Sequence, residues 1–342
     1  MNDKEVKKFL FDQISKKGDL KVSQYIDIVL YNPIFGFYNR PSSKNEHYIT
    51  SASLGLVFAE VVYNFVQNWW RSVGQPDQFS FIEVGINHSS IGKQILEKNT
   101  YLNSHINFFP IERARSSLVV GTDDIAKLEE QEIGIVFCNE LLDNLAFDLV
   151  RFDDSRWKEI KIGFQNGHLA EVLHEIDDPA FLYSLSKLDL KPTEGSVIPI
   201  QTGAMEWLRN SLKAIKKGTI IAIDYFSSTA EMINKTIDQW LRMYRHHQRI
   251  SNIFFQPSFW DITVDVAVDQ LSLVKKPTQI LTQHQFLTQG SIMDLIKDAK
   301  TRWINEKEIT FESLKNKSLA LEAQALLDFS GMGSFQVLRW VK

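Results

Sequence analysis

The sequence has almost no cysteine, no long apolar run and little excess charge. One cysteine, Cys138, occurs in 342 residues, so neither a disulfide framework nor a zinc site made of several cysteines can form. No apolar run approaches the roughly 20 residues that a membrane-spanning helix needs. A formal net charge of -4 gives no basic footprint for nucleic acid. We therefore expect neither nucleic acid nor a membrane among the partners.

The N-terminal residues also lack the marks of a targeting segment. The stretch MNDKEVKKFLFDQISKKGDLK mixes acidic residues with lysine and contains neither arginine nor an apolar signal core. This favours a cytoplasmic protein. With 44% hydrophobic and 23% charged residues, the chain has the composition of a globular protein with a substantial core, in one elaborated domain or two.

Helical spacing of apolar residues predicts a helical N-terminal part. Residues 3–16 and 22–30 fit short helices, with Ser23 available to cap the second. Apolar residues recurring from 54 to 70 predict a longer helix that packs on a core. Residues 31–53 are aromatic but irregular, which is typical of a segment that packs over a core or lines a site.

Short apolar runs predict the strands of a mainly parallel sheet. The runs are FSFIEV (79–84), INFFPIE (106–112), EIGIVFC (132–138) and TIIAID (219–224). Helix-like runs between them favour an α/β fold with helices on both faces of the sheet. Residues 156–164 and 168–176 alternate around Asn166-Gly167 and predict a hairpin. Further on, residues 233–243, 283–300 and 311–329 predict helices, and residues 331–342 contain a closing strand.

The stretch Phe79 to Gly92, FSFIEVGINHSSIG, is the most informative in the chain. A buried strand ends in Glu83, the chain turns at Gly85 and a helix begins, which is where α/β folds bind nucleotide-like cofactors. A full glycine-rich loop has further glycines where this chain has Asn87 and Ser89. The stretch therefore indicates a cofactor site whose glycine-rich loop is degenerate.

Several motifs in the same order resemble one protein family. They are VSQYIDIVLYNPIFGFY, YITSASLGLVFAE, FIEVGINHSSIG, CNELLDNLAFDLVRF, IIAIDYF, YRHHQR, WDITVDV and LTQHQFLTQG. Together they resemble the MidA-like S-adenosylmethionine-dependent methyltransferases, whose mitochondrial members are protein arginine methyltransferases that act in assembly of respiratory complex I. The resemblance runs from about Leu20 to Val341. His47, Ala52 and Ser53 replace the family's Asp, Pro and Glu, and Asp265 stands where His is usual.

The resemblance implies a Rossmann-like class I methyltransferase sheet of seven strands, mostly parallel, with an N-terminal helical extension and an inserted segment. The implied division is a helical lid over 1–75, a core over 76–225, an inserted cap over 226–285 and a C-terminal completion over 286–342. The implied cofactor is S-adenosyl-L-methionine. Its expected contacts are Thr50, Glu83, Gly85, Asn87, Glu112 and Asn139, with Glu112 placed to accept hydrogen bonds from the ribose. Asp123 or Asp124 is a further candidate for the adenine edge.

The candidate catalytic residues are Glu140, Asp143 and Asp224. If a helical turn begins after the strand that ends at Cys138, Glu140 and Asp143 share one face and could grip a guanidinium in a bidentate manner. The alternative is that they are acids stabilising a helix N-terminus. Asp224 with Tyr225 could line the same cleft or cap the next turn. His88, His246 and His247 lack supporting ligands, so we expect no metal.

Two functions follow from these expectations. The first is a methyltransferase that transfers a methyl group to a protein side chain, arginine by resemblance. The second is a catalytically degenerate member that keeps the fold and acts as a binding or assembly factor, because the departures from the family pattern fall near the cofactor entrance. A small-molecule methyltransferase remains a third reading, and the oligomeric state and the substrate stay open.

Overall fold

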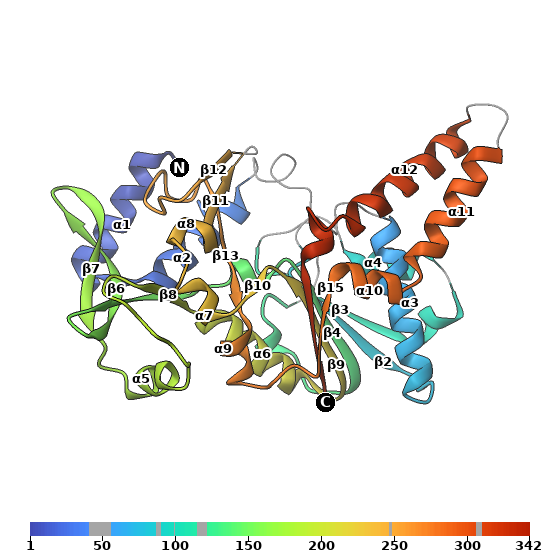
Figure 1. The fold of residues 1–342 in the computed structure, drawn as a ribbon, viewed down its shortest axis with the longest axis horizontal. Helices are drawn as coiled ribbons and strands as arrows, with labels where there is room; N and C mark the ends of the chain where they lie inside the picture. Colours follow the sequence, from blue (N-terminus) through green and yellow to red (C-terminus); the bar gives the residue numbers. More distant parts are fainter. Residues whose placement is uncertain (41–55, 87–89, 99, 115–121, 246–247, 306–309) are drawn as a thin grey trace.

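The structure is a computed structural model of the 342-residue chain. It describes residues 1–40, 56–86, 90–98, 100–114, 122–245, 248–305 and 310–342. The elements lie around two sheets, with a pair of helices projecting from one end (Figure 1). No helix in these ranges is long and apolar enough to cross a membrane.

One of these two sheets has six strands and lies at the centre of the fold. Its order is β15 (Gln279–Thr282), β16 (Gln336–Val341), β9 (Ile215–Asp224), β4 (Gln131–Asn139), β2 (Phe79–Val84) and β3 (Ile106–Ile111). The four strands expected from the sequence, β3, β2, β4 and β9, pair in parallel. The closing strand β16 lies antiparallel to both β9 and β15. The described sheet is therefore mixed and has six strands, where seven mostly parallel ones were predicted.

Helices cover both faces of this sheet because successive strand residues point to opposite sides. On one face α3 (Leu56–Ser72), α4 (Ile91–Glu97) and α10 (Gln283–Gln289) pack in a core that includes Phe81 and Ile221. On the other face α6 (Thr202–Ala214) packs over Ile82 and Ile220. The predicted helix over 54–70 is confirmed as α3, and the buried cysteine, Cys138, belongs to the second core.

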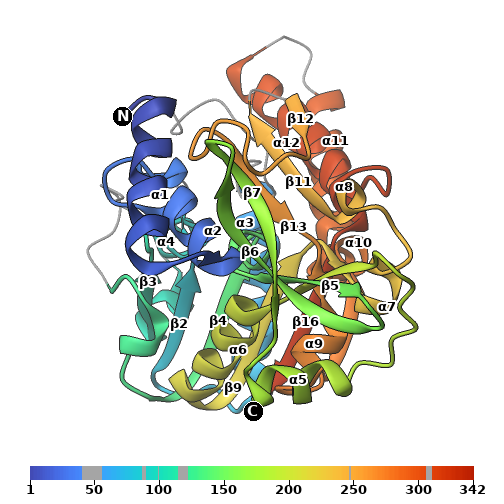
Figure 2. The same cartoon turned by 90° about the vertical axis from the view of Figure 1, so that its left-hand side faces the viewer.

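A second, antiparallel sheet lies to the left of the first in Figure 1 and in front of it in Figure 2. It contains β1 (Leu20–Lys21), β6 (Arg156–Gln165), β5 (Asp148–Asp153) and β8 (Val197–Ile200), with β7 (His168–Glu175) paired to β6. The predicted hairpin is confirmed as β6 and β7. Its turn residues Asn166 and Gly167 have φ of 51° and 79°, the left-handed conformations that a two-residue hairpin turn needs. The helix α5 (Pro179–Ser186) follows in the chain.

The N-terminal helices and the segment after β9 share one core. In this core α1 (Asp3–Lys17) and α2 (Val22–Tyr31) pack with β5, β6 and a small sheet of β12 (Gln248–Ile250), β11 (Leu241–Arg245) and β13 (Asp261–Val264). Both predicted N-terminal helices are confirmed. The N-cap of α2 is Lys21 and not Ser23, whose backbone N–H donates to Asp148.

The helix predicted over 233–243 is wrong. A single turn, α8 (Ile237–Trp240), is followed at once by β11, which pairs with β13. The segment also contains β10 (Phe226–Ser227), α7 (Thr229–Met232), β14 (Val266–Ala267) and α9 (Val268–Ser272). Leu241 and Met243 alternate onto the core side of β11, so strand pairing overrides the helical spacing.

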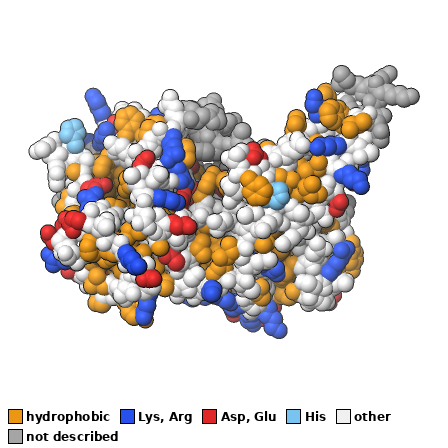
Figure 3. Space-filling view, in the orientation of Figure 1, with side chains coloured by type: hydrophobic (Ala, Val, Ile, Leu, Met, Phe, Trp, Pro, Cys, Tyr) orange, Lys and Arg blue, Asp and Glu red, His pale blue; other side chains and the backbone are white. Residues whose placement is uncertain are grey.

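The predicted helix over 283–300 is two helices, α10 and α11 (Ile292–Asn305). The break falls at Gly290, where a Cβ would lie 2.4 Å from Val61 Cγ1, and at Ser291, whose φ is 66°. The helix predicted over 311–329 is present as α12 (Phe311–Leu327), which packs on α11. These two helices project from the body, and hydrophobic side chains and Lys or Arg gather on them (Figure 3).

Candidate functional site

A cavity lies where three parallel strands of the central sheet end. Its volume is ≈ 390 Å³, and its wall includes Gly85, Glu112 and Leu141, which follow β2, β3 and β4 respectively. This edge of a parallel sheet is where α/β proteins bind their ligands, and the volume falls in the range of small-molecule sites. Of the expected cofactor contacts that the structure describes, Gly85 and Glu112 line this cavity, whereas Glu83 and Asn139 do not.

Gly85 occupies a place that no other residue fills without strain. Its φ is +79°, and a Cβ on it would lie 2.8 Å from Leu141 Cδ1. Its backbone N–H donates to the carbonyl of Ile111 at 2.9 Å, which ties the turn after β2 to the end of β3. The predicted turn at this glycine is therefore present, and it leaves space for a ligand beside the backbone.

Glu83 holds the start of α4 and does not line the cavity. Its buried carboxylate accepts hydrogen bonds from Ser90 Oγ at 2.7 Å and from the N–H groups of Ile91 and Gly92 at 2.8 and 3.0 Å. Burial raises the pKa of Glu83, and these hydrogen bonds oppose the rise. The Glu83 side chain thus ties the start of α4 to the end of β2. These two elements flank the loop that carries Asn87.

Glu112 lies on the cavity wall directly after β3. One carboxylate oxygen, Oε1, accepts from the N–H of Ala114 at 2.7 Å, which folds the backbone back at the strand end. Asp123 and Asp124 line the same cavity. Asp123 pairs with Lys127 at 2.5 Å, and Asp124 accepts from the N–H of Ala126 at 2.9 Å. Acidic groups therefore line one side of the cavity.

The N-terminal helix α2 closes another side. Its Asp27 receives both terminal nitrogens of Arg113, at 2.5 and 2.8 Å, and the Arg113 guanidinium lies 4.5 Å from the centre of the Tyr31 ring. Burial works against the charge of Arg113, but Asp27 outweighs it and the pKa of Arg113 is raised. Sequence reasoning did not include Asp27 or Arg113, because no local pattern links residues 86 positions apart.

The turn after β4 carries Asn139, Glu140 and Asp143. Glu140 has a φ of 51°, and its N–H donates to the carbonyl of Ile223 at 2.9 Å. Helical geometry begins only at the 3-10 turn Leu142–Asn144. The expected shared helical face of Glu140 and Asp143 is therefore wrong. Asn139 Nδ2 donates to Glu140 Oε1 at 3.1 Å, and Asn139 Oδ1 is buried with no partner among the described residues.

Asp224 organises this turn from the neighbouring strand. Oδ2 accepts from the N–H groups of Leu141, Leu142 and Asp143 at 3.2, 2.8 and 3.4 Å. Oδ1 accepts from the N–H of Tyr225 at 2.8 Å. Burial raises the pKa of Asp224 to about 6 against the effect of these four hydrogen bonds. Asp224 thus caps a turn, but this turn is the one after β4 and not the next turn in the chain.

Asp143 lies at the centre of a buried acidic cluster. Its pKa is raised well above the usual value, first by burial and then by the charges of Asp224, Asp261 and Glu140. Its Oδ1 is buried and has no hydrogen-bond partner among the residues that the structure describes. One oxygen of Asp143 is therefore not engaged by any described residue, which leaves it available to an incoming group.

Asp261 is the member of this cluster that sequence reasoning left out of the site. It comes from β13 and accepts from the Tyr38 hydroxyl at 2.7 Å and from Asn144 Nδ2 at 3.2 Å. Burial raises the pKa of Asp261 to about 6. The signal was present, since Tyr38 and Asp261 both lie in the motifs that carried the family resemblance.

The structure does not describe several residues that were singled out in the sequence. Thr50 and Asn87 lie outside the described residues, as do His88, His246 and His247. Among the residues described, no group of three or more His, Cys, Asp or Glu side chains could hold a metal ion.

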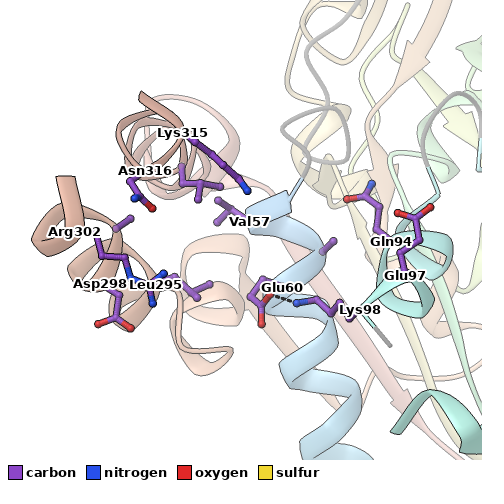
Figure 4. A pocket seen from close by; sticks show the side chains of 13 residues that line it. Val57, Glu60, Gln94, Glu97, Lys98, Leu295, Asp298, Arg302, Lys315 and Asn316 are labelled. Atoms are coloured by element: carbon purple, nitrogen blue, oxygen red, sulfur yellow. Dashed lines mark hydrogen bonds and ion pairs between the residues drawn. The ribbon is translucent and has the colours of Figure 1, made fainter. Parts of the chain in front are cut away.

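A separate cavity of ≈ 410 Å³ lies between α3, α4 and the projecting helices (Figure 4). Glu60 of α3 and Lys98, which follows α4 directly, form an ion pair in it, and Leu295 and Asn316 belong to its other side. It shares no described lining residue with the ≈ 390 Å³ cavity. None of the expected site residues that the structure describes lines it.

A family model matches most of the chain. Its description is "Putative S-adenosyl-L-methionine-dependent methyltransferase", and the match covers residues 61–287. The mitochondrial protein arginine methyltransferase NDUFAF7 homolog of Drosophila melanogaster is 22% identical over 298 residues, which are 74% of this chain and 66% of that protein. The mitochondrial protein arginine methyltransferase NDUFAF7 of Xenopus tropicalis is 29% identical over 89 residues, or 25% of this chain and 21% of that protein. The chain thus covers less than two thirds of the length of these relatives.

Solved structures share the fold. The crystal structure of a methyltransferase-like protein from Burkholderia thailandensis bound to S-adenosyl-homocysteine superposes with a TM-score of 0.83 at 19% identity, covering 99% of this chain and 92% of that chain. A native crystal structure of a protein from the same organism gives a TM-score of 0.80 with the same coverage. The likeness shows an α/β methyltransferase fold. The expected cytoplasmic location is wrong by comparison, since the relatives from Drosophila and Xenopus are mitochondrial proteins.

Proposed function

The chain belongs to this family of S-adenosyl-L-methionine-dependent methyltransferases, and on that premise we propose that it methylates a nitrogen of a protein side chain, in first place arginine. The family match confirms the resemblance seen in the sequence motifs, and with it the class of activity and the cofactor at the level of the family. The protein substrate and the arginine are supported by the names of the relatives. The observation that carries the proposal is the ≈ 390 Å³ cavity at the ends of β2, β3 and β4.

The charges around this cavity suit S-adenosylmethionine. The described lining includes five acids, Asp27, Glu112, Asp123, Asp124 and Glu206, and two bases, Arg113 and Lys127. When bound, the cofactor supplies a methyl group on a positively charged sulfonium, which an acidic surrounding stabilises. In the proposal Gly85 leaves room beside the backbone, and Glu112 accepts hydrogen bonds from the ribose.

The acceptor side is the turn after β4. We assign Glu140 and Asp143 to the guanidinium of the acceptor, because carboxylates match its paired N–H donors. Asp224 keeps the turn in place through three backbone hydrogen bonds, from Leu141, Leu142 and Asp143, and is a positioning residue. Since in-line methyl transfer needs little acid or base chemistry, the contribution of these residues is to orient the acceptor nitrogen.

The proposal also assigns a role to the segments that flank the core. The division into a lid (1–75), a core (76–225), a cap (226–285) and a C-terminal part (286–342) remains our proposal. It is supported by Asp27 and Tyr31 of the first segment on the cavity wall and by Asp261 of the third beside Asp143. The lid and the cap would then exclude water from the reacting groups.

The alternative function is that of a degenerate member that only binds partners. It rests on Asn87 and Ser89, which replace loop glycines. Both residues lie outside the described ranges. A direct test separates the two functions. The full chain is titrated calorimetrically with S-adenosylmethionine and S-adenosylhomocysteine, alongside the double variant Asn87→Gly, Ser89→Gly.

We expect micromolar binding of both compounds by the natural chain, which supports the enzyme. A natural chain that fails to bind, with binding restored by the two glycines, would favour the degenerate binding protein. Methyl transfer is then tested with radiolabelled cofactor on an extract of proteins, and acid hydrolysis of the product identifies the modified residue. Label on a residue other than arginine would correct the acceptor, and label on small molecules alone would favour the third reading.

A further inference from the structure

A third cavity contains a cation, Arg339, that no acidic side chain of the described residues neutralises. Its volume is ≈ 290 Å³, and it lies between α3, the end of α10 and strand β16. Arg339 of β16 is one of its lining residues. Arg339 lies on the same face of the strand as Val337, which belongs to the core under α3. None of its described lining residues lines either of the other two cavities.

Arg339 is partly buried and is held by one printed hydrogen bond and an aromatic ring. It is half-buried, its Nε–H donates to Thr219 Oγ1 at 3.1 Å, and its guanidinium lies 5.5 Å from the centre of the Phe65 ring. No acidic side chain of the described ranges forms an ion pair with it, and burial alone lowers its pKa. In Arg242, by contrast, Asp265 at 2.5 Å outweighs burial and the pKa is raised.

A half-buried charge without a counter-ion is costly, so an anion in the cavity would stabilise it. Arginine has five N–H donors, of which one is engaged here by a described residue, and the two terminal nitrogens form a fork that fits two oxygens of a carboxylate or a phosphate. The cavity rim adds the amides of Asn68 and Gln289, which can donate hydrogen bonds. No described lining residue is acidic.

We propose that this cavity binds a small ligand through a carboxylate or phosphate group held by Arg339. The site is separate from the cofactor cavity. Arg339 pairs in register with Ile221, three residues before Asp224, and so lies about 10 Å back from the strand ends where that cavity opens. Its small volume favours a compact anion or the terminal anionic group of a larger ligand.

The experiment uses the full chain and two probes, inorganic phosphate and citrate, titrated calorimetrically at constant ionic strength maintained with chloride. We expect saturable binding of at least one probe, which also tells phosphate from carboxylate. Arg339→Gln is expected to weaken it tenfold or more, and Arg339→Lys to give an intermediate affinity because it keeps the charge without the fork. The control Arg209→Gln, on the exposed side of α6, should bind like the natural chain.

Because Arg339 also packs on Phe65, a variant at an exposed position provides an independent reading. Asn68→Ala is expected to weaken binding severalfold with an unchanged unfolding temperature. The proposal is overturned if the natural chain binds neither probe, or if Arg339→Gln binds as well as the natural chain. S-adenosylhomocysteine is titrated into the same samples and should bind Arg339→Gln and the natural chain alike. A chain that binds the anion but not this compound would contradict the proposed function and leave the anion site standing.

Discussion

Three carboxylates near the strand ends do three different things. Glu83 caps a helix, Asp224 caps a turn, and Asp143 keeps one buried oxygen without a described partner. All three are acids at the ends of buried strands, so sequence alone gave them similar weight. The difference is set by which backbone N–H groups lie within reach, and that depends on chain segments far away in sequence. A buried acid whose oxygens are all engaged positions its neighbours, whereas one with an unused oxygen is available to a ligand.

Gly85→Ala tests the turn after β2. We expect a loss of about 1–2 kcal/mol in the free energy of unfolding, because alanine is strained at a φ of +79°. Its Cβ would also push Leu141, which lines the cavity. Chemical denaturation and titration with S-adenosylhomocysteine measure the two effects, and we expect affinity to fall at least tenfold. Gly167→Ala in the hairpin turn at a φ of 79° is the control, expected to lose stability but keep the affinity.

Asp143→Asn tests the acceptor side. A hydrogen bond to a charged group contributes about 1.5–3 kcal/mol. We therefore expect the affinity of the variant, saturated with S-adenosylhomocysteine, for a short arginine peptide to fall about tenfold or more. The affinity for S-adenosylhomocysteine itself should change less than twofold, since Asp143 does not line its cavity. Asp189→Asn, an exposed acid, is the control. Unchanged peptide binding by Asp143→Asn would remove this residue from the proposed acceptor site.

At the scale of elements, the N-terminal helix α2 contributes a wall of the cofactor cavity through Asp27 and Tyr31. The ion pair of Asp27 with Arg113 is about half exposed, so its contribution is at most about 1 kcal/mol. We expect Asp27→Asn to raise the dissociation rate of S-adenosylhomocysteine two- to fivefold in stopped-flow displacement. Asp12→Asn on the exposed side of α1 should leave the rate unchanged. A slower release from Asp27→Asn would mean that the pair hinders ligand binding.

Elements with strong local patterns could be predicted from the sequence, and those decided by distant partners could not. The strands β2, β3, β4 and β9 are short buried runs with polar ends, and the β6–β7 hairpin carries Asn166-Gly167, so both were predicted correctly. The helix predicted over residues 233–243 extends into residues that the structure places in β11, and pairing with β13 makes these a strand. The break between α10 and α11 has a local mark in Gly290, but its cause is the contact with Val61.

The same division applies to the site. Gly85 and Glu112 could be predicted because each directly follows a strand with a clear pattern. Asp27 and Arg113 could not be placed, since they lie 86 positions apart in the sequence. Asp261 lies in a motif that carried the family resemblance, but its contacts with Tyr38 and Asn144 join distant parts of the chain and could not be predicted. The left-handed conformation of Glu140 has no sequence signal either, because glutamate rarely adopts it. Tertiary contacts therefore decide which of the strand-end acids meet.

At the scale of the whole molecule, the N-terminal helices, the second sheet and the segment around β13 share one core that ends beside the acidic cluster. Tyr38 from the first segment, Asn144 from the turn after β4 and Asp261 from β13 meet in one hydrogen-bonded group. In the folded chain Asp261 is buried and removed from water. The stability of the whole molecule is thereby linked to the protonation of this carboxyl.

The sign of this linkage can be worked out. Burial raises the pKa of Asp261 from 3.8 unfolded to about 6 folded, so the folded state binds more protons between these values. The contribution of Asp261 to stability is therefore greatest below pH 4 and is lost as the pH rises through 6, a change on the order of 2–3 kcal/mol. Asp261→Asn cannot ionise and still accepts from Tyr38 through its amide oxygen. We expect the stability of the variant relative to the natural chain to increase from pH 4 to pH 7 in urea denaturation.

Asp269→Asn serves as the matched control, because Asp269 also accepts hydrogen bonds, from Thr229 N and Oγ1 at 3.0 Å each, but is not among the groups that raise the pKa of Asp143. Its stability relative to the natural chain should not increase over this pH range. A difference between Asp261→Asn and the natural chain that stays constant from pH 4 to pH 7 would show that Asp261 ionises as easily in the folded chain as in the unfolded one. The lid and cap would then leave the cluster open to water, and the closed acceptor site that we propose would lose its main physical support.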